Sequence, residues 1–139
     1  MKLVYLDSNI WIYFWENRGD GLRPLGEFAF QVLKRAYECE FAVVVSSTVL
    51  DELLFNYSEE TVNEMLKDLK RTNKYIYIRA REEHNREARE YSLKTGIGFN
   101  DCLHAVLAKA RGCECLVTQN IRHFEKLVVL IEPKSPSDL

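Results

Sequence analysis

The feature that most constrains the fold is the alternation, along the chain, of short apolar runs and longer segments with helical periodicity. Leu3–Leu6, Phe41–Val45 and Tyr75–Ile78 are short runs of apolar or aromatic residues without a helical period, which suits buried strands. Between these runs, apolar residues recur at helical spacing, as they do over residues 25–36 and 62–69. Strands separated by helices predict an α/β fold: a three-layer α/β/α sandwich around a mainly parallel sheet of about five strands.

The C-terminal third of the chain continues the same alternation. A helix from about Asn100 to Arg111 is apolar almost throughout, and we expect it to be buried. Leu116–Thr118 is predicted as the fourth strand and Leu127–Ile131 as the fifth. A length of 139 residues suits one domain. We therefore expect a single domain over residues 1–132, followed by a polar tail over residues 133–139.

Charge and cysteine content limit the classes of partner and metal. The formal net charge is −2, so an RNA partner would need a local basic patch or bound cations. The chain opens without a cleavable signal pattern and contains no apolar run long enough to span a bilayer, so we expect a cytoplasmic protein with no membrane partner. The four cysteines are expected to be reduced, buried thiols, because Cys39 and Cys102 lie in apolar helical patterns and Cys113 and Cys115 are too close together for a typical zinc pair.

Four polar side chains fall at positions that a βαβ fold brings to one edge of the sheet. Asp7 follows the first strand, Glu52 lies early in the helix after the second, Asp101 opens the buried helix, and Asn120 follows the fourth strand. Parallel strands end at the edge where the following helices begin, and open α/β folds bind their ligands there. We therefore expect these four side chains to converge.

The convergence of three carboxylates predicts a bound cation. Asp7, Glu52 and Asp101 would repel one another, so that one of them is protonated or a cation binds. Oxygen ligands without paired His or Cys favour Mg²⁺ or Mn²⁺ over zinc. Each residue also has an ordinary interpretation: Asp7 and Asp101 as helix caps, Glu52 as a solvated helix residue, and Asn120 as a turn residue. Their joint placement is what favours a functional site.

The residues around these positions resemble the motifs of the PIN-domain family. Leu6-Asp7-Ser8-Asn9-Ile10 resembles its opening motif, and the segment 45–53, which contains the acidic Glu52, resembles its second. Residues 100–105, with Asp101, resemble the third motif, and residues 118–124 resemble the fourth, with Asn120 in place of the commoner Asp. These motifs occur in the family's order and cover almost the whole chain.

The resemblance implies an enzyme that hydrolyses RNA with a bound metal ion. Many PIN domains are metal-dependent endoribonucleases that use Mg²⁺ or Mn²⁺, and Asp7, Glu52 and Asp101 occupy the ligand positions, bound directly or through water. Asn120 completes the catalytic set, and Asn9 and Thr118 are supporting residues. Short members are commonly VapC-like toxins of type II toxin–antitoxin pairs, dimeric and inhibited by a small antitoxin protein.

Other basic and titratable residues give weaker signals. Arg122 lies next to the predicted site, and we expect it to contact an RNA phosphate. Asn120 removes one negative charge relative to the four-acid motif, which leaves open whether one ion or two would bind. His84, His104 and His123 are scattered, and we assign each of them a structural or surface role.

The sequence also allows competing interpretations. A haloacid-dehalogenase-like phosphatase needs a second Asp where this chain has Asn9; a receiver domain needs a further acidic pair, and a P-loop is absent from the sequence. The alternative of another class is a catalytically silent PIN-like module that binds protein or RNA partners. The largely apolar helix Ile10–Trp15 also favours a homodimer, although the monomer's own core could bury it.

Overall fold

The computed structural model describes residues 1–17 and 24–139, which fold around one parallel sheet. The strands are β1 (Leu3–Leu6), β2 (Ala42–Ser46), β3 (Tyr75–Ile78), β4 (Cys115–Val117) and β5 (Pro133–Lys134). The helices are α1 (Ser8–Glu16), α2 (Leu25–Tyr37), α3 (Ser47–Asn56), α4 (Glu59–Arg71), α5 (Glu82–Thr95), α6 (Phe99–Ala110) and α7 (Ile121–Phe124), with short 3₁₀ helices η1 (Glu125–Leu127) and η2 (Pro136–Asp138).

The order of the strands creates a switch point in the middle of the sheet. The order is β3-β2-β1-β4-β5, and every neighbouring pair is parallel. From β1 the chain winds outward through β2 to β3, and it then returns to build β4 and β5 on the other side of β1. In open α/β sheets, ligands bind at the carboxyl ends of the strands where the direction of winding reverses. Here that point lies between β1 and β4.

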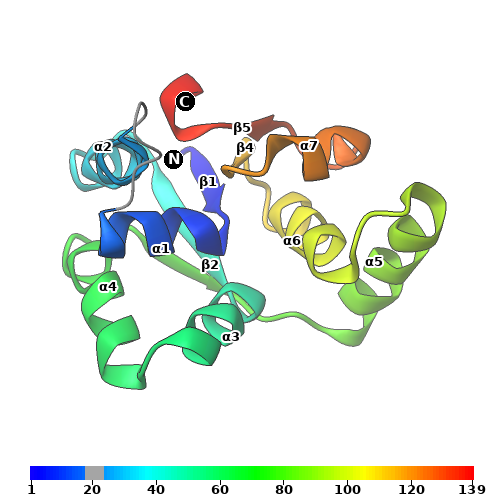
Figure 1. Ribbon diagram of the computed structural model, residues 1–139, viewed down its shortest axis with the longest axis horizontal. Helices are drawn as coiled ribbons and strands as arrows, with labels where there is room; N and C mark the ends of the chain where they lie inside the picture. Colours follow the sequence, from blue (N-terminus) through cyan, green and yellow to red (C-terminus); the bar gives the residue numbers. More distant parts are fainter. Residues whose placement is uncertain (18–23) are drawn as a thin grey trace.

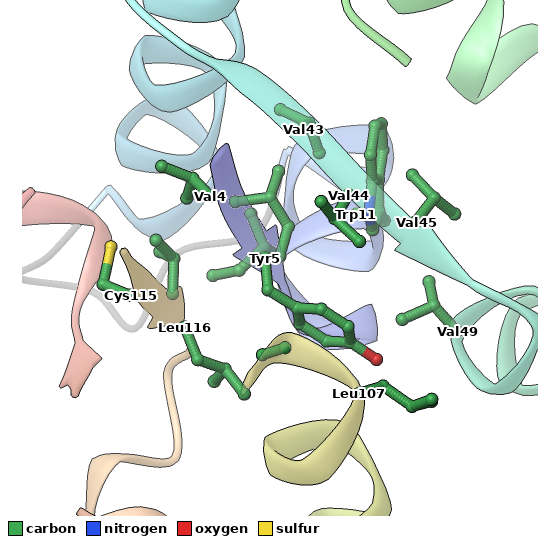
Figure 2. Packing of buried hydrophobic residues seen from close by; sticks show 14 of the residues in the cluster. Val4, Tyr5, Trp11, Val43, Val44, Val45, Val49, Leu107, Cys115 and Leu116 are labelled. Atoms are coloured by element: carbon green, nitrogen blue, oxygen red, sulfur yellow. The ribbon is translucent and has the colours of Figure 1, made fainter. Parts of the chain in front are cut away.

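Helices cover both faces of the sheet, as Figure 1 shows, with α1, α2 and α4 on one side of the strands and α5 and α6 on the other. Side chains alternate along each strand, so Tyr5, Val44 and Leu116, which are paired in register, share one face. Figure 2 shows the Tyr5 ring lying alongside α6, near Leu107. The predicted three-layer architecture with a five-stranded parallel sheet is confirmed.

The predicted fifth strand is wrong in its position. Leu127, Leu130 and Ile131 are buried, whereas Val128 and Val129 between them are exposed. This spacing of three and four residues is that of a helical turn, and the amides of Leu130 and Ile131 both bond to the carbonyl of Leu127. A short apolar run does not distinguish a strand from a helical segment. Here the local hydrogen bonds form a helical turn.

The segment expected as a polar tail supplies the fifth strand instead. Pro133–Lys134 form β5 at the edge of the sheet. A proline is tolerated in an edge strand because it has no backbone N–H group to donate to a neighbouring strand. The amide of Thr118 donates to the carbonyl of Lys134 at 2.9 Å, and η2 beyond β5 packs against α2. Residues 133–139 are therefore part of the folded body.

Cys39 is exposed, with a φ of 68°, and not buried as we expected. In the described ranges, 1–17 and 24–139, every helix is either too short or too polar to cross a membrane.

Candidate metal centre

Asp7 lies at the switch point because it is the first residue after β1. Its amide donates to the carbonyl of Val117 in β4, which extends the β1–β4 pairing by one residue. Its carboxylate also caps α1, since Oδ1 accepts a hydrogen bond from the amide of Ser8 at 2.7 Å. The side chain is nevertheless buried, with 4% of Asp7 exposed. A buried carboxylate is stable only when several donors or a cation compensate its lost hydration.

Thr118 and Asn9 supply donors to the second carboxylate oxygen. Thr118, the first residue after β4, donates from Oγ1 to Asp7 Oδ2 at 2.8 Å. Asn9 Nδ2 lies 3.3 Å from the same oxygen and 3.3 Å from Thr118 Oγ1. The amide of Asn120 donates to Thr118 Oγ1 at 3.0 Å. The backbone after β4 thus fixes the Thr118 side chain, which in turn fixes Asp7.

Glu52 reaches the same edge from α3. This helix begins directly after β2, and Ser46 caps it by accepting the amide of Val49 on its hydroxyl oxygen. Glu52 therefore sits in the second turn, with its side chain 33% exposed. Its Oε1 accepts a hydrogen bond from His104 Nε2 at 2.5 Å. The contact joins α3 to α6 across the end of the sheet.

His104 is the residue that connects the site to the core. It is 1% exposed, and its Nε2 also lies 3.7 Å from Asp7 Oδ1. Its other ring nitrogen, Nδ1, lies 2.6 Å from the hydroxyl of Tyr5, which itself lies 2.6 Å from Ser46 Oγ. Burial alone would lower the pKa of His104, but the hydrogen bond to Glu52 and the surrounding negative charges outweigh burial and raise it.

These contacts define one compact set of donor atoms. In the part of the chain that the structure describes, Asp7, Glu52 and His104 each offer one donor atom, and these atoms lie within 4.8 Å of one another. Two carboxylate oxygens and one imidazole nitrogen form a donor set that suits a divalent transition-metal ion. The two negative charges of Asp7 and Glu52, held close together, also favour a cation. The residues present therefore fit the divalent ion that the sequence motifs imply.

Asp101, which we predicted as a third carboxylate ligand, lies beside this set. It occupies the first turn of α6, and its Oδ2 is 3.0 Å from Nδ1 of His123, a residue of α7. Burial and the charge of Asp7 raise the pKa of Asp101, although both neighbouring histidines oppose the rise. The Asp101 carboxylate thus interacts electrostatically with Asp7, but it is not among the donor atoms that lie within 4.8 Å of one another.

The last two predicted residues lie on the rim. Asn120 is exposed and precedes α7. Arg122 is exposed within α7, one residue before the His123 that contacts Asp101. Beside Glu52, a cavity of about 720 Å³ opens between α3, α6 and the residues after β3. Its walls include Phe55, Arg79, Asn85, Phe99 and Asn100.

His104 was not predicted to be a member of this cluster. A lone histidine in an apolar helix is ordinarily a core residue that has found hydrogen-bond partners, which is why we assigned it a structural role. The signal that could have identified it is its spacing of three residues from Asp101 on the same helix, which places both on one face. Tyr5 carries a similar signal, because it lies in β1 two residues before Asp7, a spacing that places both side chains on one side of the extended chain.

The parallel sheet and the carboxylates clustered at its switch point define an α/β protein with a candidate metal site. A model of the PIN domain matches residues 4–129, so the chain belongs to the PIN-domain family. No curated protein matches the sequence significantly.

Solved structures share the fold at low identity. VapBC2 from Rickettsia felis, bound to a DNA fragment from its promoter, has a TM-score of 0.66 with 22% identity, over 96% of this chain and 98% of that one. DNA-bound VapBC from Salmonella typhimurium has a TM-score of 0.67 with 19% identity, over 98% and 99%. A toxin–antitoxin complex from Klebsiella pneumoniae has a TM-score of 0.67 with 14% identity, also over 98% and 99%.

Proposed function

We propose that this protein is a metal-dependent endoribonuclease that hydrolyses RNA phosphodiester bonds. The observation that carries the proposal is the meeting of Asp7 and Glu52 at the switch point, with Asp101 on the adjoining turn of α6. When bound, Mg²⁺ or Mn²⁺ would lower the pKa of an attacking water and neutralise charge on the phosphate. Asp7 and Glu52 would hold the ion directly, and Asp101 would do so directly or through water.

The surrounding residues have positioning roles in this proposal. Thr118 and Asn9 keep the Asp7 carboxylate in place through the hydrogen bonds to its Oδ2. Asn120, on the rim, would hydrogen-bond a water of the ion. Arg122, exposed on α7, would contact a phosphate of the substrate.

The cavity beside Glu52 supports single-stranded RNA as the substrate. Phe55 is 89% exposed at its wall and presents an apolar ring to solvent, as proteins that stack unpaired bases do. Arg79 adds a positive charge to the same wall, which matters because the net charge of the chain is −2. A nucleotide seated there would lie next to Glu52, which lines the same cavity.

Cleavage of an RNA pool tests the proposal. We expect cutting that requires added Mn²⁺ or Mg²⁺ and stops with a chelator. Asp7→Asn and Asp101→Asn should each abolish it, whereas Glu60→Gln, an exposed carboxylate on α4, should cut normally. Equal cutting by Asp101→Asn would reject that residue as a ligand, and equal cutting by Asp7→Asn would reject the site.

A catalytically silent binding module remains the competing function, and Asn120 at a position where the motif commonly has Asp is what favours it. Calorimetric titration with Mn²⁺ separates the two functions. Binding that Asp7→Asn removes supports the enzyme. A folded protein that takes up no ion supports the module.

We further propose that the chain is the toxin of a type II toxin–antitoxin pair, with a small antitoxin protein as its partner. The likeness in fold to VapBC complexes supports this assignment. Induced expression in a bacterial host should arrest growth, and Asp7→Asn should relieve the arrest. Unimpaired growth in a host where metal-dependent cleavage is measured in the lysate would contradict the role as a toxin.

A homodimer is part of the same proposal. The core of the monomer already buries Ile10 and Trp11, so a smaller surface is left than the sequence suggested. Trp15 and Phe30 remain 42% and 39% exposed, and the Phe30 ring stacks on Phe14. Sedimentation equilibrium should give a dimer that the change Phe30→Glu weakens. A wild-type monomer at micromolar concentration would refute it.

A further inference from the structure

His104 occupies a position where an ordinary core residue would be apolar. Its neighbours on α6, from Cys102 to Ala108, are all buried. A histidine placed there needs partners for both ring nitrogens, because an unpaired buried polar group is strongly destabilising. Both partners are present: Glu52 at Nε2 and Tyr5 at Nδ1. This arrangement aims Nε2 out of the core and into the carboxylate pair.

We propose that His104 is itself a ligand of the divalent ion, through Nε2, and that Tyr5 and Ser46 are residues that position it. The inference rests on the proposed function of the site and adds a nitrogen ligand to its oxygen ligands. His104 Nε2 lies 2.5 Å from Glu52 Oε1 and 3.7 Å from Asp7 Oδ1. Adjacent ligands of an octahedral ion lie about 3.0 Å apart. The two distances bracket that value, and a small rotation of the Glu52 side chain, which is 33% exposed, would lengthen the shorter one toward it.

The contacts behind the ring allow the required tautomer. A ligating Nε2 carries no proton, so the proton must sit on Nδ1 and be donated to a second group. The Tyr5 hydroxyl oxygen, 2.6 Å away, can accept it. The Tyr5 hydroxyl then donates to Ser46 Oγ, also at 2.6 Å. Because both hydroxyls can rotate, the same chain also satisfies the opposite tautomer, in which Nε2 donates to Glu52.

An imidazole ligand changes the ion that the site prefers. Mg²⁺ takes oxygen ligands, whereas imidazole suits transition metals. A neutral nitrogen also adds a ligand without adding negative charge beside Asp7, which is 4% exposed. The geometry therefore favours Mn²⁺ over Mg²⁺, and it supplies a donor in a site where Asn120 replaces an acid of the commoner motif.

Pulsed electron paramagnetic resonance of the Mn²⁺-loaded protein tests the proposal without relying on activity. The echo envelope should carry modulation from a coordinated nitrogen, and labelling histidine with ¹⁵N should shift its frequency. His104→Gln should remove the modulation and weaken Mn²⁺ binding at least about tenfold, with a smaller effect on Mg²⁺. His123→Gln, which alters the partner of Asp101, should keep the modulation.

Tyr5→Phe separates positioning from ligation. It should retain the nitrogen modulation but weaken Mn²⁺ binding by roughly tenfold, as the loss of contacts behind a ligand commonly does. Mn²⁺ binding that depends on Asp7 but shows no histidine nitrogen in the wild type would overturn the role of His104 alone. Absence of Mn²⁺ binding would overturn the proposed function as well. The ¹⁵N comparison uses the unaltered chain, so it stands even where His104→Gln misfolds.

Discussion

The Tyr5 hydroxyl offers a direct measure of the polar contacts beneath the candidate site. Tyr5 is fully buried, and its hydroxyl contacts His104 Nδ1 and Ser46 Oγ at 2.6 Å each. Tyr5→Phe removes that hydroxyl without changing the apolar ring. Ser46 keeps the amide of Val49 as a partner, whereas Nδ1 of His104 is left with none.

The size of the effect follows from which group loses its partner. A buried polar atom left without a hydrogen bond costs about 1–3 kcal/mol. With a urea m-value of about 1–3 kcal/mol/M, the unfolding midpoint should fall by roughly 1 M. Urea unfolding of the metal-free protein, followed by circular dichroism, measures this shift. The matched control is Tyr77→Phe on β3, a tyrosine that is 48% exposed and should change stability by less than about 0.5 kcal/mol.

A double mutant identifies the contact responsible. When both partners of a buried hydrogen bond become apolar, most of the penalty disappears. Tyr5→Phe combined with His104→Leu should therefore be more stable than the sum of the two single changes predicts, by about 0.5–3 kcal/mol. Additive effects, or a Tyr5→Phe protein as stable as the Tyr77→Phe control, would refute the hydrogen-bond chain from Ser46 through Tyr5 to His104.

Three further perturbations test separate features. Asn120→Asp should tighten Mn²⁺ binding several-fold in calorimetry, since it adds a negative charge to the rim; unchanged affinity would place Asn120 outside the site. Iodoacetamide at pH 8 should label the exposed Cys39 but not Cys113 in the native protein, because burial raises the pKa of Cys113 to about 12 and leaves about one thiol in ten thousand ionised. Labelling of Cys113 should rise with pH, and rapid labelling at pH 8 would contradict the raised pKa of its thiol. Gly26→Ala should cost about 1–3 kcal/mol in thermal unfolding, because a Cβ there would lie 2.6 Å from backbone at the end of α1, whereas Gly98→Ala meets open space; equal melting temperatures would refute the close approach.

The sequence was sufficient to predict most of the fold because its pattern and the final packing agree. The apolar runs at Leu3–Leu6 and Tyr75–Ile78 became strands with the bounds predicted. The prediction was wrong at Leu127–Ile131, where all five residues are apolar and the sequence therefore shows no period, although their burial follows a helical turn. β5 itself could not be recognised, because two residues that include a proline carry no strand signal, and only pairing with β4 defines them.

The sequence predicts the edge of the sheet at which each site residue lies, because the order of strands and helices determines that edge. Asp7 and Glu52 were expected at the carboxyl edge, and they meet through atoms close enough to share an ion. Side-chain pairing inside the site was not predictable. Asp101 turns to His123, and His104 takes the place beside Glu52. Such choices depend on rotamers and distances between helices, which residue spacing along one chain does not specify.

The short strand β5 also covers an edge of the sheet that could otherwise pair with another molecule. The carbonyl of Lys134 in β5 accepts the amide of Thr118, and the carbonyl of Glu132 just before β5 accepts the amide of Leu116 in β4. The guanidinium of Arg35 on α2 also donates to the carbonyl of Leu139 at 2.7 Å. A protein that ended at residue 132 would lose the Lys134 carbonyl as the partner of the Thr118 amide and would expose that end of β4, where another copy could pair. Self-association of such a shortened chain would begin one residue from Thr118, so aggregation and loss of ion binding would occur together.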